Sequence, residues 1–188
     1  MRLLLATLLG VLCLAAAEPG QRAPGFALMD SNGDLHDLYD FRGKPVLVEF
    51  MQTGCAHCIA FADTLDKVKA KYGDKLEILA VANPPDTPEK VAVFIKSHSV
   101  KYPIVFDMGQ AAYSYIRKST FDLPQVFLVD PNGIVFNRYG YSALTKDIFE
   151  GNGLFGEIDR LLAASGSKAP AAPAKAPAKT PAKAPGKK

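Results

Sequence analysis

Apolar runs and amphipathic stretches alternate along most of the chain, and this alternation predicts strands and helices in turn. Val46–Met51 is almost wholly apolar, which is typical of a strand that is buried on both faces of a sheet. After it, apolar residues recur at helical spacing as far as Tyr72, and a second apolar run covers Leu76–Ala82. The next helix should begin after Thr87, whose side chain can cap it ahead of Pro88.

The second half of the chain repeats this order with shorter elements. We expect a strand over 102–106, a helix over 111–118, strands over 125–129 and 134–139 around a turn, and an amphipathic helix over 144–164 that Gly151-Asn152-Gly153 interrupts. Nearer the N-terminus, Ser31-Asn32-Gly33 is a turn signal between two short strands, which predicts a separate hairpin. Together these elements predict an α/β fold in which helices flank a central mixed sheet.

The first residues, 1–17, have the layout of a secretory signal peptide. Arg2 supplies a positive charge, Leu3–Leu14 is apolar but too short for an ordinary membrane span, and an Ala-x-Ala cleavage signal precedes Glu18. Cys13 lacks the small preceding residue of a lipoprotein signal, so we expect it to be lost on cleavage. The protein should therefore be exported, to the periplasm as the first expectation, with an uncleaved N-terminal membrane anchor as the alternative.

The other end, 165–188, contains only Ser, Gly, Lys, Ala, Pro and Thr. Such a segment cannot bury enough surface to offset its ordering entropy, which predicts a disordered spacer. Its six lysines would alternatively give weak contact with an anionic membrane surface or cell wall. They also account for the net charge of +3, because residues 18–164 hold 15 basic and 19 acidic side chains. The charge therefore gives no case for nucleic-acid binding, and 18–164 has the length of one domain.

Cys55-Ala56-His57-Cys58 stands where a predicted buried strand ends and a helix begins. In the first turn of a helix the two sulfurs of a C-x-x-C pair can meet, so a disulfide can form and break with little backbone movement. The unpaired N–H groups and the dipole at a helix N-terminus favour a thiolate at the first cysteine. We therefore predict Cys55 as the nucleophile and Cys58 as the shielded, resolving cysteine. The redox-active disulfide is the only cofactor-like group expected, and no metal is expected.

Other uses of a C-x-x-C pair fit this sequence less well. Half of a zinc site would need a second Cys or His pair at ligand spacing, which the chain lacks. Haem attachment would need histidine directly after the second cysteine, where Ile59 stands. A passive disulfide is the remaining reading, but one that closes so short a loop constrains the unfolded chain little.

Several motifs resemble those of the thioredoxin-like proteins of the TlpA and redoxin group, from Ala23 to about Arg160. The matching pieces are Ala23-Pro-Gly-Phe26, Gly43-Lys-Pro-Val-Leu-Val48, the C-x-x-C pair, and Leu123-Pro-Gln-Val-Phe-Leu-Val-Asp130 followed by Asn132-Gly133. The resemblance implies a thioredoxin-like fold with an N-terminal hairpin extension, and disulfide exchange with exported proteins. It also implies that Pro124 is a cis-proline facing the sulfurs and that the Leu123 backbone pairs with an extended substrate. Thr53 and Gly54 are the other expected substrate contacts.

Two further residues of the motif region carry expectations. Glu49 is a lone acid six residues before Cys55, where thioredoxin itself carries a buried acid. Burial would raise its pKa and let it exchange protons with Cys58, whereas the alternative is that it reaches solvent or pairs with a lysine. His57, when protonated, would stabilise the Cys55 thiolate and make the disulfide more oxidising, as in DsbA-type motifs. The surrounding sequence resembles the often-reducing TlpA type, so the redox direction stays open.

The sequence also departs from the family pattern. Thr53-Gly54 replaces the aromatic residue that usually precedes the first cysteine, and the chain has no Trp. A thiol peroxidase is one alternative, disfavoured because Gln52 stands where peroxiredoxins place a threonine. A copper-delivery protein using both thiolates and His98 is another, disfavoured because Sco-like relatives space their cysteines more widely. We otherwise expect His36 and His98 to be ordinary surface residues. The expected partners are exported protein clients and a redox-recycling protein, and we expect a monomer.

Overall fold

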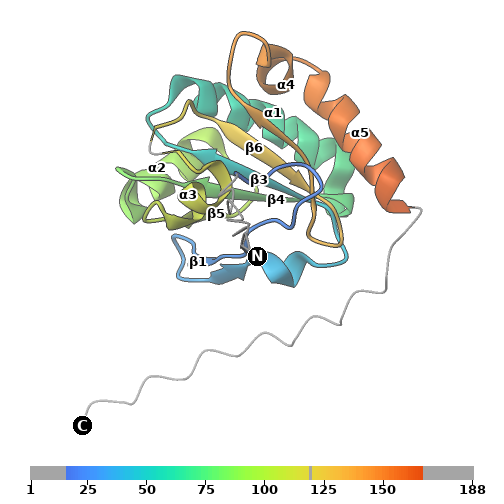
Figure 1. Cartoon of the computed structure of the whole chain (residues 1–188). Helices are drawn as coiled ribbons and strands as arrows, with labels where there is room; N and C mark the ends of the chain where they lie inside the picture. The colour runs from blue at the N-terminus through green and yellow to red at the C-terminus, as the bar shows by residue number, and fades with distance from the viewer. Residues whose placement is uncertain (1–15, 119, 167–188) are drawn as a thin grey trace, which may run out of the picture.

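A computed structural model of the chain describes residues 16–118 and 120–166, and its centre is a five-stranded sheet (Figure 1). In spatial order the strands are β5 (Ile104–Phe106), β4 (Glu77–Ala82), β3 (Val46–Met51), β6 (Gln125–Val129) and β7 (Val135–Gly140). β3 runs parallel to β4, and β4 parallel to β5, whereas β6 lies antiparallel to both β3 and β7. The mixed sheet expected from the sequence is confirmed.

Helices cover both faces of this sheet (Figure 1). They are α1 (Ala56–Tyr72), α2 (Pro88–His98), α3 (Gln110–Ile116), α4 (Lys146–Glu150) and α5 (Gly153–Gly166), with short 3-10 turns η1 (Leu38–Phe41) and η2 (Gly73–Lys75). One core cluster draws on α1, α2, α4 and α5, and the other draws on α3 and the N-terminal segment. Within the described part of the chain, no helix combines the length and apolar character needed to cross a membrane.

Side chains of the central strand β3 alternate between the two faces of the sheet, because successive residues of a strand point to opposite sides. Val48 and Phe50 join the cluster on the α3 side. Leu47 and Met51 join the cluster on the α1 side. Because side chains alternate along the strand, Glu49 lies on the same face as Leu47 and Met51. A buried acid therefore points to the α1 side of the sheet.

The helix expected over 144–164 breaks at the expected interruption, Gly151-Asn152-Gly153, and two separate helices stand in its place. The break falls at Gly151 and Asn152, where the Asp147 carboxylate accepts the Asn152 N–H at 3.3 Å. That carboxylate lies so close to Gly151 and Gly153 that a side chain at either position would collide with it. At Gly151 the backbone leaves the helical conformation (φ −116°, ψ −146°), which separates α4 from α5.

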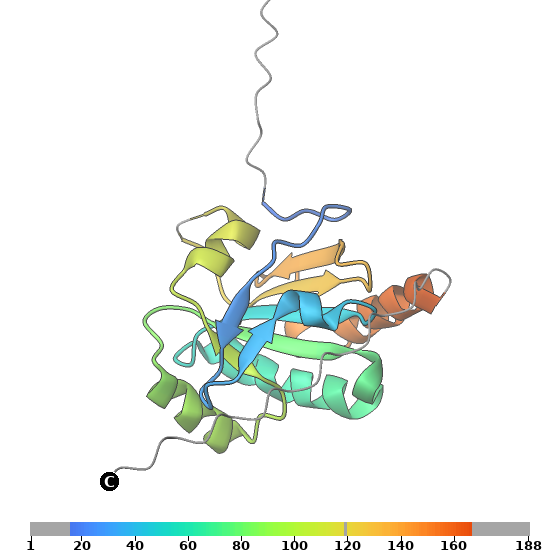
Figure 2. The same ribbon diagram turned by 90° about the horizontal axis from the view of Figure 1, so that it is seen from below.

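An N-terminal extension precedes the central sheet and contains the predicted hairpin. β1 (Ala27–Met29) and β2 (Leu35–Asp37) pair antiparallel, and a single bridge between Asp30 and Val105 joins the hairpin to β5. Figure 2, seen from below, shows the hairpin in front of the sheet on the face away from α1. The hairpin extension is confirmed.

Both ends of the described chain bear on the expected domain boundaries. α5 continues to Gly166, just past the expected end at 164, and the rest of the expected tail lies outside the described residues. At the other end, the description begins at Ala16, so most of the expected signal peptide also lies outside it. Ala17 is buried, and its N–H donates to the Tyr115 carbonyl at 2.8 Å. The last residue of the expected leader thus packs against the domain.

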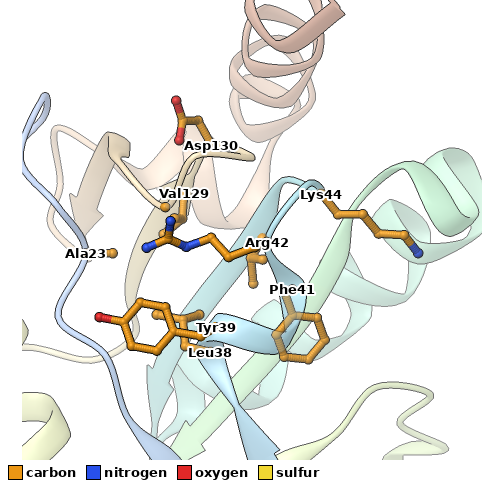
Figure 3. A pocket seen from close by; sticks show the side chains of 10 residues that line it. Ala23, Leu38, Tyr39, Phe41, Arg42, Lys44, Val129 and Asp130 are labelled. Carbon is orange, nitrogen blue, oxygen red and sulfur yellow. The ribbon is translucent and has the colours of Figure 1, made fainter. Parts of the chain in front are cut away.

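A cluster of aromatic and basic side chains fastens the extension to the sheet. The guanidinium carbons of Arg22 and Arg42 each lie 5.0 Å from the centroid of the Tyr39 ring. Arg22 precedes Tyr39 in the sequence, and Arg42 follows it. Figure 3 shows Arg42 extending past Tyr39 towards Ala23, beside a cavity of about 10 Å³ that is large enough for about one water molecule. This cavity lies at the start of β3, whereas the cysteines follow its other end.

Candidate active site

The two cysteines lie at the start of α1, directly after the loop that follows β3. Cys55 is the N-cap of the helix, and its Sγ accepts the Cys58 N–H at 3.3 Å. Both cysteines are free thiols in this structure; Cys55 is partly exposed, whereas Cys58 is 1% exposed. The first sulfur therefore sits at the positive end of a helix dipole, with its partner one turn further on, as the sequence predicts.

The Leu123–Pro124 segment faces the first cysteine. The Leu123–Pro124 peptide bond is cis, which confirms the prediction for Pro124. The Cys55 thiol donates to the Leu123 carbonyl, with 3.7 Å between Sγ and oxygen. Within the described residues the Leu123 N–H donates no hydrogen bond, and Pro124 is buried. A second cis bond, Pro84–Pro85, lies in the loop after β4 and was not expected from the sequence.

Glu49 lies beneath the motif as a buried acid. It is 1% exposed, its Oε1 has no hydrogen-bond partner, and it forms no ion pair with a described lysine. The alternative placement of Glu49 in solvent or against a lysine is therefore wrong. Burial raises its pKa to about 8. Burial also raises the pKa of the Cys58 thiol, and the nearby Glu49 raises it further, so the two groups are electrostatically linked.

The loop before Cys55 is held by a residue that the sequence did not single out. The Asp86 carboxylate accepts both the Thr53 N–H and the Thr53 hydroxyl, each at 2.6 Å. Gly54 is exposed, and the Gln52 side-chain amide donates to the Pro84 carbonyl. The loops after β3 and β4 meet because parallel strands end at the same edge of a sheet. Applied to the two buried strands predicted from the sequence, this rule is the one argument that could have placed Asp86 beside the motif.

His57 lies against two side chains from the C-terminal half of the chain. Its ring stacks on Tyr141, with centroids 3.8 Å apart and planes 20° apart. Its Nδ1 lies 3.9 Å from Glu150 Oε1, and the Tyr141 hydroxyl donates to that same oxygen at 2.6 Å. The hydrogen bond from Tyr141 holds the pKa of the Glu150 carboxyl below its usual range, with Lys146 and His57 adding to this effect. Tyr141 and Glu150 are so far from His57 in sequence that no local pattern could have paired them.

Two grooves border the motif. The first, of about 390 Å³, lies between α3 and the loops after β3 and β4, and Leu123 is at its edge. Its lining includes Gln52, Asn83, Pro84, Ala112, Tyr113 and Phe121. The second, of about 420 Å³, follows α2 and is lined by Thr53 and His98 among others.

The two other histidines occupy different places. His98 packs on Phe94 with ring centroids 4.6 Å apart, and His36 pairs with Asp30 at 3.0 Å in the hairpin. Among the described residues, no three His, Cys, Asp or Glu side chains gather as a metal-binding group. His98 is therefore not assembled with the cysteines as the copper alternative would require.

Comparison with known proteins identifies the family to which this fold and site belong. The family model described as AhpC/TSA matches residues 19–138, which is more than half of the chain. The chain belongs to the AhpC/TSA family. This AhpC/TSA protein is 28% identical over 120 residues to the thioredoxin-like protein YneN of Bacillus subtilis (strain 168), covering 63% of this chain and 69% of YneN. It is 32% identical over 123 residues to the thiol-disulfide oxidoreductase ResA of Bacillus thuringiensis subsp. konkukian (strain 97-27), covering 64% of this chain and 69% of ResA.

A solved structure supports the same classification of this AhpC/TSA protein. A candidate thiol:disulfide interchange protein DsbE from Chlorobium tepidum matches with a TM-score of 0.67 at 25% identity, covering 78% of this chain and 99% of that one. The thioredoxin-like fold is confirmed, as is the resemblance to redoxin-type proteins. The protein is an enzyme of the thiol–disulfide oxidoreductase class.

Proposed function

We propose that this protein exchanges disulfides with exported protein clients, with Cys55 as the nucleophile and Cys58 as the resolving cysteine. The observation that carries this proposal is the position of Cys55 Sγ. It accepts an N–H at the start of α1 and also contacts the Leu123 carbonyl, so the partly exposed sulfur lies at the N-terminus of a helix and next to a backbone segment where a client can lie.

The reaction proceeds in two exchanges. The Cys55 thiolate attacks one sulfur of a client disulfide; the client S–S bond breaks, a mixed disulfide forms, and the other client sulfur leaves as a thiolate. Cys58 then attacks Cys55 Sγ, which forms the Cys55–Cys58 disulfide and releases the client thiolate. Two electrons pass from the enzyme dithiol to the client, and oxidation of a client dithiol is the same sequence reversed. A recycling partner restores the starting form.

Glu49 serves the second exchange, because Cys58 must lose its proton before it can attack. Burial raises the pKa of the Cys58 thiol, so the proton needs a nearby acceptor. Glu49 lies on the strand beneath, and its pKa of about 8 is close to neutral pH. A group with such a pKa can both take up and return a proton at neutral pH. The unpartnered Oε1 is free to accept it.

The client segment is proposed to lie along Leu123. The Leu123 N–H makes no hydrogen bond among the described residues, so an extended segment can pair with it beside Cys55. Side chains that flank the client cysteine would enter the groove between α3 and Pro84. Thr53, Gly54 and Pro124 complete the contact surface around the sulfur.

Export and partners follow from the sequence and from the relatives. The relatives ResA and DsbE are thiol–disulfide exchange proteins by name, which supports protein thiols as substrates. The leader pattern supports an exported, periplasmic enzyme. We propose that the enzyme acts as a monomer, and that its lysine-containing tail gives weak contact with an anionic surface.

The test is the reduction of insulin by dithiothreitol, followed by turbidity, with the purified protein and two single-cysteine variants. Cys55→Ser should reduce the rate to the uncatalysed level, because no nucleophile remains. Cys58→Ser should accumulate the mixed disulfide, seen by mass spectrometry as a covalent adduct with the client. Full activity in Cys55→Ser would contradict the proposal. Rapid peroxide consumption would instead favour a peroxidase, and copper retained after desalting would favour copper delivery.

A further inference from the structure

Three side chains from distant parts of the sequence meet beside the nucleophile; we call His57, Tyr141 and Glu150 the imidazole clamp. The Tyr141 ring covers one face of the imidazole, with 3.8 Å between the ring centroids. The Tyr141 hydroxyl and His57 Nδ1 both approach Glu150 Oε1, at 2.6 Å and 3.9 Å. His57 is one residue after the start of α1, so the clamp fixes a group inside the C-x-x-C motif itself.

The clamp is anchored on both sides of the site. The Tyr141 N–H donates to the Pro124 carbonyl at 3.0 Å, which ties Tyr141 to the segment facing Cys55. Glu150 follows Phe149, which is fully buried and packs on Phe61 of α1 with ring centroids 5.0 Å apart. The Phe149 carbonyl also accepts the hydroxyl of a buried threonine on α1 at 3.0 Å. The clamp therefore joins the cis-proline segment, α4 and α1, and Cys55 caps α1 and contacts the cis-proline segment.

Two polar side chains contact the imidazole, the Glu150 carboxylate and the Tyr141 phenol. Cys55 caps the same helix, two residues before His57. Lys146 lies behind Glu150, with its Nζ 3.3 Å from Oε2. The hydrogen bond with Glu150 raises the pKa of the Tyr141 phenol, so Tyr141 remains a neutral donor to that carboxylate. When His57 is protonated, Glu150 is its counter-ion.

We propose that Tyr141 and Glu150 are positioning residues that act through His57 to set the reduction potential of the Cys55–Cys58 pair. The inference rests on the proposed function. A protonated imidazole held near Cys55 stabilises the reduced form, whose sulfur is negative, but gives nothing to the uncharged disulfide. Holding the ring in place and supplying its counter-ion therefore make the disulfide a stronger oxidant. Tyr141 also places an aromatic ring against the motif, in which Thr53-Gly54 replaces the aromatic residue that usually precedes the first cysteine.

The test is the equilibrium of the purified full-length protein with reduced and oxidised glutathione at pH 7, for four substitutions. Glu150→Gln and Tyr141→Phe are made in the wild type and again in His57→Ala. Tyr141→Phe keeps the stacked ring and removes only its hydroxyl. Glu157→Gln, on α5 and ion-paired with Arg160, is the matched control. The same proteins are assayed for insulin reduction.

In the wild-type background, Glu150→Gln and Tyr141→Phe should each shift the equilibrium constant about two- to fivefold towards the disulfide, the range expected for a partly exposed ion pair. His57→Ala should shift it on the order of tenfold, which is about 30 mV for a two-electron couple. In His57→Ala the two other substitutions should have no further effect, and Glu157→Gln should have none in either background. The difference in this equilibrium constant between the wild type and His57→Ala should grow as the pH falls.

Equal shifts with and without His57 would overturn the proposal, because the residues would then act without the imidazole. Unchanged equilibria in all variants would overturn it as well. Failure of the wild type to catalyse insulin reduction would instead count against the proposed function, so the two failures are distinguishable. Far-ultraviolet circular dichroism identifies any variant that has failed to fold, and Tyr141→Leu, which removes both the hydroxyl and the stacked ring without adding a titratable group, then replaces Tyr141→Phe.

Discussion

At the scale of single residues, Glu49 differs from every other side chain of β3 because it is the one that can ionise. The strand places it on the α1 face, among apolar neighbours, where a negative charge is poorly solvated. Its pKa of about 8, against 4.5 for the free group, means that folding favours its protonated form. Stability from this group is therefore fully present below pH 4.5 and is lost as the pH rises towards 8.

Glu49→Gln should remove this pH dependence. Between pH 5 and pH 8 the free energy of unfolding of the wild type should fall, relative to Glu49→Gln, by on the order of 3 kcal/mol. Urea unfolding of the reduced proteins at the two pH values measures the difference. Glu89→Gln on α2 is the control: its pKa is lowered by the Thr87 hydrogen bond, so it stays ionised over this range and should leave the profile unchanged. Parallel profiles for wild type and Glu49→Gln would contradict the expected burial.

At the scale of elements, the strands and most helices could be predicted because each has a local pattern. The buried run of β3, the cap of α2 by Thr87, and the hairpin turn all lie where the sequence places them. The interruption between α4 and α5 was predicted but not the separation into two helices, because two glycines within an amphipathic stretch weaken a helix without showing that it ends there. Asp86 and Tyr141 were missed for another reason: their roles come from loops and strands that meet only in the folded molecule.

α4 offers a test of how one short element supports the site. Phe149 is fully buried and contacts both Phe61 and Tyr141, with ring centroids 5.0 Å and 5.5 Å away. Phe149→Ala should cost roughly 3–5 kcal/mol of unfolding free energy and loosen α4 from α1. Leu144→Ala is the control, since Leu144 is 98% exposed just before α4 and should change stability little. Thermal and urea unfolding measure the loss, and a change under about 1 kcal/mol would show that α4 is not anchored in this way.

At the scale of the whole molecule, the two ends of β3 lie beside different features: the active site at one end and the attachment of the N-terminal extension at the other. The cysteines and their partners gather after its last residue, whereas the contacts of Tyr39 with Arg22 and Arg42 fasten the N-terminal extension near its first. The charge is divided as well: six lysines lie in 165–188, and the domain is acidic overall. The catalytic domain and the basic segment should therefore act independently.

Truncation after Gly166 should separate these two properties. The last buried apolar side chain of α5 is Leu161, so the core is complete before the truncation point. We expect the free energy of unfolding to change by less than about 0.5 kcal/mol and the rate of insulin reduction to be unchanged. Binding to vesicles that contain anionic lipid, measured by sedimentation at low and at 0.15 M salt, should be lost on truncation. Equal vesicle binding by both forms would contradict a role for the basic segment.

The burial of Ala17 has a consequence for the order of events during biogenesis. A peptidase needs an extended, accessible backbone, but here the Ala17 N–H is bonded to Tyr115 and the methyl group is enclosed by the domain. The expected leader must then be removed before the domain folds, while the backbone at Ala17 is still extended and accessible. A molecule that completes its tertiary structure first would keep its leader.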